Sequence, residues 1–488
     1  MAEQKLPTRA EDFAEWYNQL VLRAELADYA PVRGCMIVRP YGWALWENIQ
    51  QALDRRFKAT NPPHVNVAFP LFIPRSFIDK EKSHVAGFSP ELAVVTHGGG
   101  EELAEPLVVR PTSETIIGHS WAKWVQSYRD LPLLYNQWNS VVRWELRTKL
   151  FLRTMEFYWQ EGHTAHATRE EAEAETRQML DIYYDFAVND AAIPAIRGRK
   201  SDAEKFAGAD TTYSLEAMMG DGKALQSCTS HFLGQNFAKA FDVKYLDPQG
   251  QLQHCWTTSW GLSTRFIGAI IMAHGDDQGL VLPPKLAPFQ VVIVPIGKSE
   301  EEKAACTDAG RKLREELVAA GIRVKLDERD GLTPGFKFND WEMRGVPVRM
   351  EIGPKDIAKG QVVLARRDRP GKEGKSFVAQ TGIAAAVNDL LAQIQQALHD
   401  RALAFRQANT RTPKDYAEFK AAVESGFALA HWCGSPECEA SIKEETKATM
   451  RCIPLDLAAV GASTTSASGV CIYCSKPAKE KAVFARAY

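Results

Sequence analysis

The fold class is decided by three stretches that place arginine beside aromatic and small residues: Arg143-Trp144-Glu145, Arg153-Thr154-Met155-Glu156-Phe157 and Gly261-Leu262-Ser263-Thr264-Arg265. An arginine in a strand next to aromatic residues is costly to bury unless its charge meets an anion. A guanidinium group fits a phosphate with two parallel hydrogen bonds. Phe157 can stack on a purine while an arginine covers the opposite face. Taken singly, each arginine is better explained as a surface ion pair, but the joint spacing predicts an ATP site.

Around these stretches, residues 1–285 predict a mainly antiparallel α+β domain, because strand-like runs are separated by uneven helices. An apolar stripe with helical spacing predicts a helix, a glycine turn predicts a hairpin, and a capping box predicts a helix that ends near Asn189. These features are, in chain order, the stripe Trp43, Trp46, Ile49, Leu53 and Phe57, the strand Val65–Ile73, the run Leu92–Thr96 with the turn Gly98-Gly99-Gly100, the strand Pro106–Arg110, and the box Thr168 with Glu171.

Prolines at 283, 284 and 288 mark a boundary, after which the pattern changes. A buried-strand run, a helix and three further strands predict a βαβ-type α/β domain over residues 286–398. A long helical stretch, Ala386–Phe405, then leads to a small third α+β region, residues 399–488. The runs behind the second domain are Phe289–Ile296, Ser299–Gly321, Ile322–Leu326, Val346–Ile352 and Gln361–Arg366.

Five of the nine cysteines crowd into the interval from Cys433 to Cys474. Four residues separate Cys433 from Cys438 and two separate Cys471 from Cys474, which is the spacing of paired thiolates in tetrahedral zinc sites. Clustering in a large chain without an apolar run of signal-peptide type favours a metal over disulfides. We therefore predict a structural zinc ion on these four thiols, with reduced free thiols as the alternative. Cys452 is expected to be a buried spare.

The overall composition is that of a folded, water-exposed chain. Of its 488 residues 45% are hydrophobic and 25% charged, and its net charge is −2, so contacts with nucleic acid have to come from local basic patches. The longest apolar stretches, such as Phe266–Ala273, are too short to span a bilayer, and Met1–Glu15 is polar and acidic. We expect a cytoplasmic protein without membrane contact.

The arginine stretches resemble motifs 2 and 3 of the class II aminoacyl-tRNA synthetases, and Val32–Phe57 resembles motif 1, their dimer-forming element. From about Leu20 to Tyr488 the chain resembles the prolyl-tRNA synthetases of class IIa in particular, in their archaeal and eukaryotic-like branch. The stretches that carry this resemblance are Arg110-Pro111-Thr112-Ser113-Glu114-Thr115, Trp159-Gln160-Glu161-Gly162-His163, Thr229-Ser230-His231-Phe232-Leu233-Gly234-Gln235-Asn236-Phe237 and His274-Gly275-Asp276.

The resemblance implies that L-proline is activated with ATP and Mg²⁺ to prolyl-adenylate and pyrophosphate, and is then transferred to the 3′ end of tRNA(Pro). It implies that Arg143 holds the α-phosphate and the proline carboxylate, and that Glu145 orients adenine or the motif 2 loop. Arg143, Arg265 and Glu145 then form the catalytic set. For ATP, the resemblance further implies Arg153 and Arg265 on the outer phosphates, Phe157 on adenine, and Thr154, Gln226, Thr229 and Ser263 in the rest of the nucleotide site. For proline, it implies Thr112 and Glu114 at the nitrogen, and Trp159, Glu161, His163, His231 and Phe88 around the pocket.

The chemistry of these residue types agrees with the resemblance. Proline needs an apolar wall, a carboxylate for its secondary ammonium and a cation for its carboxylate, and Trp159, Glu114 and Arg143 supply these types. In-line attack of the carboxylate on the α-phosphorus needs no protein nucleophile, so positioning and charge stabilisation can carry the rate. Single residues have simpler explanations: Thr112 and Glu114 could cap a helix, and a lone tryptophan or histidine is more often structural. Gln226-Ser227-Cys228-Thr229 departs from the family's usual Gln-Gly-Ala-Thr, and Cys228 is expected to be a packed thiol.

The stretch Pro334–Pro347 resembles the prolyl version of the class IIa anticodon-binding domain. Anticodon bases are single-stranded, so their edges are open to recognition. Proline anticodons carry two adjacent guanines, whose O6 and N7 atoms arginine can pair with, while a carboxylate can accept from N1 and N2. Glu342 and Arg349 are the candidates, with a helix-surface glutamate and a strand-edge arginine as the alternative.

The resemblance carries three further expectations. The C-terminal domain of this branch holds a four-cysteine zinc site, and its tail, here Phe484–Tyr488, returns toward the catalytic domain. Motif 1 implies a homodimer. Many bacterial relatives carry a hydrolytic editing domain between motifs 2 and 3, but here the residues between Phe157 and Gly261 are already used by a predicted helix, the strand Tyr213–Met218 and the segment Gln226–Phe237. We expect no editing domain.

Two rival functions would require different residues at these positions. A threonyl-tRNA synthetase would place cysteine and histidine zinc ligands in its amino-acid pocket, where this sequence has Trp159 and His163. A synthetase-like tRNA-binding or regulatory protein usually loses motif 2 or motif 3 arginines, whereas Arg143, Arg153 and Arg265 are all present. ATP–pyrophosphate exchange with single amino acids separates the three functions.

Overall fold

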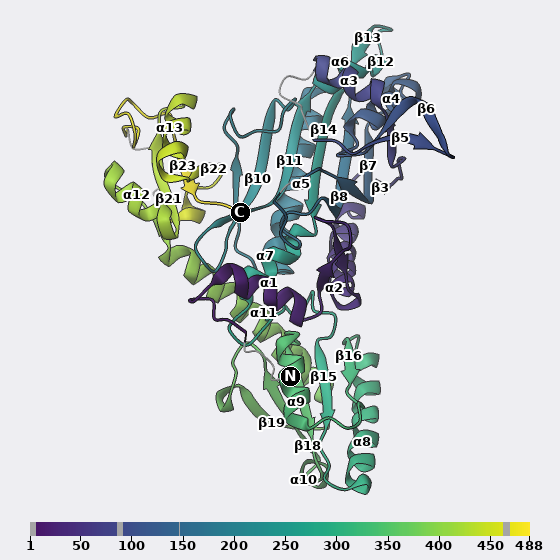
Figure 1. Ribbon diagram of the computed structural model, residues 1–488, viewed down its shortest axis with the longest axis vertical. Helices are drawn as coiled ribbons and strands as arrows, with labels where there is room; N and C mark the ends of the chain where they lie inside the picture. The colour runs from purple at the N-terminus through teal and green to yellow at the C-terminus, as the bar shows by residue number, and fades with distance from the viewer. Residues whose placement is uncertain (1–5, 85–90, 146, 462–468) are drawn as a thin grey trace.

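The computed structural model describes residues 6–84, 91–145, 147–461 and 469–488. Its main feature is an 11-stranded sheet in the order β20-β21-β23-β22-β9-β10-β11-β14-β8-β7-β3. Figure 1 shows this sheet in the upper part of the molecule, with a separate, smaller sheet below it. None of the helices in the described part of the chain is long and apolar enough to cross a membrane.

The middle of the large sheet is antiparallel, as expected from the sequence of residues 1–285. Each strand from β9 to β7 pairs antiparallel with its neighbour, whereas the edge strand β3 runs parallel to β7. The strands are β3 (Val65–Asn66), β7 (Leu133–Val142), β8 (Glu156–His166), β9 (Ile196–Arg199), β10 (Thr211–Met218), β11 (Ala224–Gly234) and β14 (Trp256–Ser263).

Helices bury their apolar faces against this sheet and form the largest core, which includes Trp16, Trp46 and Trp260. The predicted capping box is confirmed, because the Thr168 hydroxyl accepts a hydrogen bond from the Glu171 amide at 3.2 Å. The helices of this region are α1 (Phe13–Arg23), α2 (Pro40–Lys58), α3 (Arg75–His84), α4 (Glu114–Trp124), α5 (Arg169–Asn189), α6 (Asn236–Phe241) and α7 (Arg265–His274). Two small antiparallel hairpins are formed by β1 (Ala27–Tyr29) with β2 (Met36–Val38), and by β12 (Lys244–Leu246) with β13 (Leu252–His254).

One predicted strand is wrong, and one predicted hairpin is confirmed. The run Val65–Ile73 is divided between β3 and β4 (Phe72–Pro74), which belong to different sheets; Pro70, which has no N–H to donate, lies in the gap. The hairpin joins β5 (Val94–Gly98) to β6 (Glu101–Val109) through Gly99 and Gly100, whose φ angles of +62° and +89° suit glycine.

The second domain is the expected α/β unit. Its 5-stranded sheet has the order β16-β15-β17-β18-β19, with β15 parallel to β16 and β17, and the other pairs antiparallel. Helix α11 (Ile383–Ala408) continues from it without a break through residue 398. The elements before α11 are β15 (Val291–Pro295), α8 (Glu300–Ala319), β16 (Val324–Leu326), α9 (Pro334–Met343), β17 (Val348–Ile352), α10 (Pro354–Ala358), β18 (Gln361–Arg366) and β19 (Lys375–Ala379).

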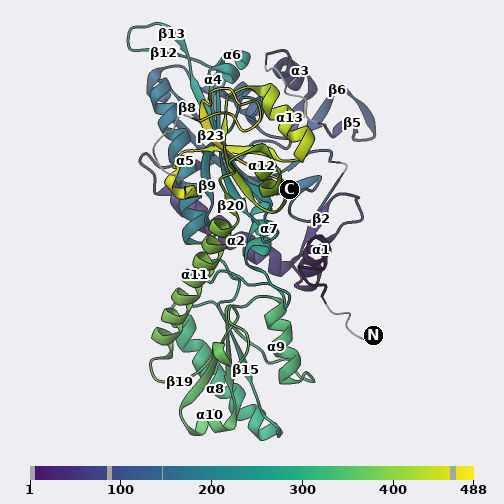
Figure 2. The same ribbon diagram turned by 90° about the vertical axis from the view of Figure 1, so that its left-hand side faces the viewer.

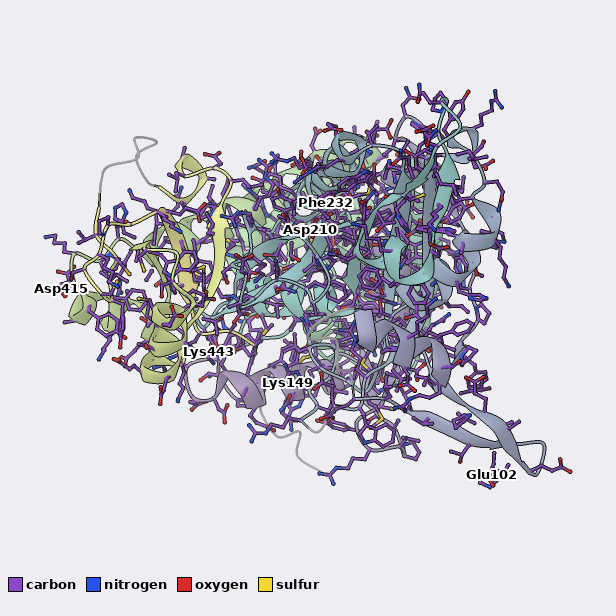
Figure 3. All side chains as sticks on the ribbon, turned by 90° about the horizontal axis from the view of Figure 1, so that it is seen from above. Glu102, Lys149, Asp210, Phe232, Asp415 and Lys443 are labelled. Atoms are coloured by element: carbon purple, nitrogen blue, oxygen red, sulfur yellow. The ribbon has the colours of Figure 1, made fainter. Side chains whose placement is uncertain are left out.

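The C-terminal region does not stand apart, because its strands extend the large sheet. Strand β22 pairs with β9 through Ile453 and Arg199, so β20 to β23 continue the large sheet beyond β9. In Figure 2 the C-terminal elements lie in front of this sheet. Seen from above, Asp415 and Lys443 of this region lie across the molecule from Glu102 in the β5–β6 hairpin (Figure 3). The elements are β20 (Thr410–Arg411), α12 (Tyr416–Ser425), β21 (Phe427–Trp432), α13 (Pro436–Thr446), β22 (Thr449–Pro454) and β23 (Glu480–Ala485).

The tail returns to the large sheet within residues 1–285, as the resemblance implied. The Tyr488 amide donates a hydrogen bond to the Ala224 carbonyl at 3.1 Å, and its hydroxyl donates to the Asp221 carboxylate at 2.7 Å.

Candidate active site

A cavity of about 490 Å³ opens over β8, β11 and β14. Its lining brings together twelve of the residues predicted from the sequence, although they are spread over more than 150 positions of the chain. They are Thr112, Glu114, Arg143, Phe157, Trp159, Glu161, His163, Gln226, Thr229, His231, Ser263 and Arg265.

Strand β8 supplies one wall of the cavity. Because side chains alternate along a strand, the odd-numbered residues from Phe157 to His163 share a face, and all four of them line the cavity. Strand β14 runs alongside, with Ser263 opposite Trp159 and Ser259 opposite His163. Gly261 leaves room for the indole, since a Cβ atom there would lie 3.2 Å from the Trp159 ring.

The carboxylate of Glu161 is held from several sides at the bottom of this wall. It accepts hydrogen bonds from the Ser113 amide at 3.1 Å, the Gln137 amide group at 2.9 Å and the Asn139 amide group at 2.6 Å. It also accepts one from the Ser113 hydroxyl and one from His163 Nε2, the latter at 2.9 Å. Burial alone would raise the pKa of Glu161, but these donors lower it below its usual value. The carboxylate is therefore charged and fixed in place.

Glu114 and His163 complete a cluster of opposite charges. Ligand atoms of Glu114, Glu161 and His163 lie within 4.8 Å of one another, and all three residues are buried. Burial opposes the charge on His163, yet Glu161 and Glu114 together raise the pKa of its imidazole. Thr112 donates its hydroxyl hydrogen to Glu114. Two carboxylates around one imidazole leave negative charge in excess, which suits a small organic cation.

Another part of the cavity lining is cationic. The Arg143 guanidinium lies 5.3 Å from the Phe157 ring and 5.6 Å from the Trp159 ring, and Nε donates to the Pro111 carbonyl at 3.2 Å. Arg265 Nε donates to the Leu152 carbonyl at 2.9 Å. Burial, and then repulsion from Arg143 and Arg153, lowers the pKa of Arg265 to about 10. Mutually repelling guanidinium groups in a cavity form a site for a polyanion such as a triphosphate.

Of the predicted active-site residues that the structure describes, three are not among the lining residues: Glu145, Arg153 and Thr154. Arg153 is exposed and forms an ion pair with Glu145 at 3.7 Å. The Thr154 hydroxyl donates to the Glu156 carbonyl at 2.7 Å. Phe88 lies outside the described residues.

The environment of His231 keeps it neutral. Burial, His163 and Arg143 together lower its pKa to about 3, and its Nδ1 atom lies 2.9 Å from the Thr212 hydroxyl. Cys228 is buried, as predicted, and burial raises the pKa of its thiol well above the usual value. It is packed in the core and is not an activated nucleophile.

Sequence reasoning missed Ser259 and the loop 204–207, which also line the cavity. Among the described residues, neither the Ser259 hydroxyl nor the Trp159 indole N–H has a hydrogen-bond partner, although both are buried. Orphaned polar groups are costly, so a ligand in the cavity is a natural partner for them. A signal was available for Ser259, which alternates with Gly261 and Ser263 along one strand.

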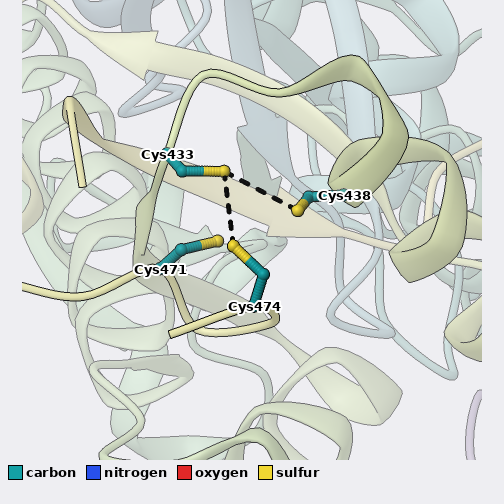
Figure 4. A group of neighbouring side chains, drawn as sticks. All are labelled: Cys433, Cys438, Cys471 and Cys474. Carbon is teal, nitrogen blue, oxygen red and sulfur yellow. Dashed lines mark hydrogen bonds between the residues drawn. The ribbon is translucent and has the colours of Figure 1, made fainter. Parts of the chain in front are cut away.

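A second candidate site lies in the C-terminal region, where the four predicted thiols converge (Figure 4). The Cys433 sulfur lies 3.6 Å from that of Cys438 and 3.7 Å from that of Cys474. Tetrahedral zinc binds thiolates at about 2.3 Å, which separates the sulfurs by about 3.8 Å, whereas a disulfide requires about 2.05 Å. The thiols thus fit a zinc ion. Cys452 is buried elsewhere, as predicted.

The two anticodon candidates are in contact with each other. Arg349 Nη1 donates to a Glu342 carboxylate oxygen, and its other nitrogens donate to Glu351 at 2.9 and 3.1 Å. Its guanidinium lies 4.0 Å from the Phe338 ring centroid. The pair lines a small cavity far along the chain from the ATP-site residues.

Comparison with known proteins agrees with this geometry. Three family models match the chain. The model described as "tRNA synthetase class II core domain (G, H, P, S and T)" matches residues 96–274, and the model described as "Anticodon binding domain" matches residues 290–380. The model described as "Prolyl-tRNA synthetase, C-terminal" matches residues 416–488. The chain is 56% identical over 490 residues to the proline–tRNA ligase of Roseiflexus castenholzii, and 56% identical over 488 residues to that of Chloroherpeton thalassium, with both chains fully covered each time. It is 54% identical over 491 residues to a chloroplastic/mitochondrial proline–tRNA ligase of Arabidopsis thaliana, covering 100% of this chain and 89% of the plant protein. The chain therefore belongs to the prolyl-tRNA synthetase family of class II aminoacyl-tRNA synthetases.

Proposed function

We propose that the chain is an active proline–tRNA ligase, which activates L-proline with ATP and transfers it to tRNA(Pro). The observation that carries this proposal is the 490 Å³ cavity, whose lining combines an anionic cluster with the arginines Arg143 and Arg265. Such an arrangement fits a small amino acid whose ammonium and carboxylate groups point in opposite directions. The retained motif arginines weigh against a non-catalytic relative.

The arginine end would hold the nucleotide. Arg143 would bridge the proline carboxylate and the α-phosphate, while Arg265 and Arg153 would take the outer phosphates together with Mg²⁺. Phe157 would stack on adenine, and Gln226, Thr229 and Ser263 would complete the site. Arg153 is paired with Glu145 at 3.7 Å, so nucleotide binding has to exchange that partner for a phosphate. Charge developing at the α-phosphorus would then meet a preorganised cation.

The anionic end would hold the proline nitrogen. Glu114 and Thr112 would contact the secondary ammonium, with His163 and Glu161 behind them, and Trp159 would cover the ring. Support comes from the five hydrogen-bond donors on Glu161, which leave it as a fixed charge, whereas Glu114 has the cavity before it. The threonyl-type alternative would need cysteine and histidine metal ligands here, and the converging side chains are two glutamates and one histidine.

Residues 286–398 would form the anticodon-binding domain, with residues 1–285 as the catalytic domain and 399–488 as the C-terminal domain. Glu342 and Arg349 would read the adjacent guanines. If so, Glu342→Ala and Arg349→Ala should weaken charging of tRNA(Pro) and spare proline activation, because activation takes place in another domain. Equal losses of both activities would mean that the pair supports the fold instead.

Cys433, Cys438, Cys471 and Cys474 would hold a structural zinc ion that joins α13 to the loop before β23. Motif 1 would form the homodimer. Support for the dimer comes from Tyr29, Val32 and Ile37, large apolar residues that are exposed around the β1–β2 hairpin, because such patches are characteristic of interfaces. Sedimentation of the unaltered chain and of Val32→Asp tests it, and a monomer in both cases contradicts it.

ATP–pyrophosphate exchange with each amino acid supplied singly tests the whole proposal. Proline should support rapid exchange, and threonine should support none above background. Exchange that is driven by threonine, or by no amino acid, would reject the assignment.

A further inference from the structure

The segment that follows motif 3 connects the cavity in residues 1–285 to the second domain. Helix α7 begins at Arg265, which lines the cavity, and ends at His274; after Gly275 comes Asp276. The Asp276 carboxylate accepts two hydrogen bonds from Arg367, one from Nη2 at 2.6 Å and one from Nη1 at 2.7 Å. The Arg367 side chain is only 2% exposed. Burial opposes the charge on Asp276, but Arg367 lowers the pKa of the carboxyl group. The pair is thus a bidentate ionic contact between a buried arginine and a half-buried carboxylate.

The third nitrogen of the Arg367 guanidinium faces the anticodon site. Its Nε donates to the main-chain carbonyl of Glu342 at 2.9 Å. The same glutamate directs its carboxylate to Arg349. Arg367 therefore lies between the anticodon candidate Glu342 and Asp276, two residues beyond the end of α7, and it has hydrogen bonds to each.

The backbone segments around this contact are closely packed. The Leu280 amide donates to the Met343 carbonyl at 3.0 Å. Gly279 has a φ angle of +143°, and a Cβ atom there would lie 2.6 Å from the Met343 Cα atom. The end of α9 and the segment 276–280 therefore have to move together.

The other end of α7 bears on the motif 2 loop. Arg265 Nε donates to the Leu152 carbonyl at 2.9 Å. One turn further along, a Cβ atom on Gly268 would lie 2.4 Å from the Leu152 side chain. At 1.5 Å per residue, the ten residues of the helix span about 15 Å. A small displacement at Asp276 therefore reaches both Arg265 and the loop that carries Arg153.

We propose that Arg367 is a positioning residue that couples recognition of the anticodon at Glu342 to the geometry of the ATP and proline site, through Asp276 and α7. This inference rests on the proposed function. A tRNA whose anticodon engages Glu342 and Arg349 fixes the end of α9, Arg367 passes that constraint to Asp276, and α7 holds Arg265 and the motif 2 loop in the arrangement needed for transfer. Coupling between sites is typically worth a factor of 5 to 150.

The test compares cognate tRNA(Pro) with a transcript in which one anticodon guanine is replaced by adenine. The measured quantity is the ratio of charging kcat for the two transcripts, at saturating proline and ATP. In the unaltered enzyme this ratio should be large. Asp276→Asn and Arg367→Gln should each reduce it about tenfold, by lowering kcat for the cognate tRNA alone, while tRNA-free ATP–pyrophosphate exchange stays within twofold. Arg367→Lys, which keeps the charge but not the fork, should restore part of the ratio.

A matched control lies in the same loop. Asp277 is the next residue, and its side chain is 47% exposed. It forms an ion pair at 3.4 Å with Arg9, a residue near the start of the chain rather than in the second domain. Asp277→Asn should leave the ratio unchanged. If Asp276→Asn and Arg367→Gln lower kcat equally for both transcripts, lower exchange and charging together, raise only the KM for tRNA, or change nothing, the coupling role is rejected. Failure of the proposed function would look different, because the unaltered enzyme would then lack proline-dependent exchange.

Discussion

Replacing Glu161 by glutamine should impair proline binding far more than ATP binding. The substitution keeps the shape of the side chain and removes its charge. Glu161 accepts hydrogen bonds through both oxygens: the Ser113 hydroxyl, Gln137 and Asn139 donate to one, and the Ser113 amide and His163 donate to the other. A glutamine can place its carbonyl oxygen at the first position. Its NH₂ group then faces the Ser113 N–H, which loses its acceptor.

The magnitude follows from these contacts. An orphaned buried donor costs about 1–3 kcal/mol, and a hydrogen bond to a charged group contributes about 1.5–3 kcal/mol. The His163 imidazole also loses one of the two carboxylates that raise its pKa. A combined effect of about 2–4 kcal/mol on bound proline corresponds to a KM for proline raised by about 30- to 700-fold, at 1.4 kcal/mol per factor of ten.

ATP–pyrophosphate exchange, with proline and ATP varied separately, measures both constants. The KM for ATP should change less than threefold, because the nucleotide contacts lie at the arginine end of the cavity. Glu156→Gln is the control, since Glu156 is on the same strand but is not among the cavity residues. A proline KM within twofold of the unaltered value, or a larger change for ATP than for proline, would refute the reasoning.

Three further predictions concern other parts of the chain. Arg143→Ala should reduce ATP–pyrophosphate exchange by at least a hundredfold, because two anionic groups each lose a charge-assisted hydrogen bond worth about 1.5–3 kcal/mol. Arg147→Ala, at an exposed position of the same loop, should keep near-normal exchange. Equal activity of the two variants contradicts the role of Arg143. The purified protein should contain about one zinc per chain, and Cys433→Ser should lower zinc content and melting temperature more than Cys452→Ser; freshly purified, unchelated protein without zinc rejects the site. Alanine should be activated slowly, since one missing methylene is worth only about 1–3 kcal/mol, and preformed alanyl-tRNA(Pro) should be released no faster than in buffer; rapid deacylation by the enzyme would reveal an editing site.

Much of the fold could be predicted because it depends on local patterns. The box at Thr168 and the turn at Gly99 are confirmed, and β18 has the predicted bounds, Gln361–Arg366. The face shared by Trp159, Glu161 and His163 followed from the two-residue period of a strand. The motif resemblance then indicated which faces meet. The roles of these residues stay predictions, although the structure brings twelve of them to one cavity.

What could not be predicted depends on long-range register and on loops. The alternation of Ser259 with Gly261 and Ser263 places it on their strand face, but it does not show that β14 pairs with β8 so that Ser259 lies opposite His163. The lining loop 204–207 has no periodicity to read. The strand Val65–Ile73 was predicted as one run because its composition is apolar, but its two ends pair with different sheets. Tertiary pairing overrides propensity in such runs.

The junction between β22 and β9 explains why the C-terminal region belongs with the catalytic sheet. Lys200 Nζ lies 2.7 Å from one oxygen of Glu216, and Arg451 Nη2 lies 3.0 Å from the other, with all three side chains at least nine-tenths buried. Burial opposes the charge on Glu216, but Arg451 and Lys200 lower the pKa of its carboxyl group. Removing one member of a buried ionic group typically costs about 3–5 kcal/mol, because the others are left uncompensated.

This ionic group is also close to the lining of the cavity. Glu216 is opposite Gln226 in the β10–β11 ladder, and Gln226 lines the cavity. On its other side, Ser201, next to Lys200, donates a hydrogen bond at 2.8 Å to Glu439 of α13, and α13 also carries Cys438 of the thiol cluster. A continuous series of buried contacts therefore joins the four thiols to the floor of the active site. The thiol cluster lies outside the cavity, but a shift of α13 would strain the hydrogen bonds that connect Glu439, Ser201, Lys200 and Glu216 to the strand opposite Gln226.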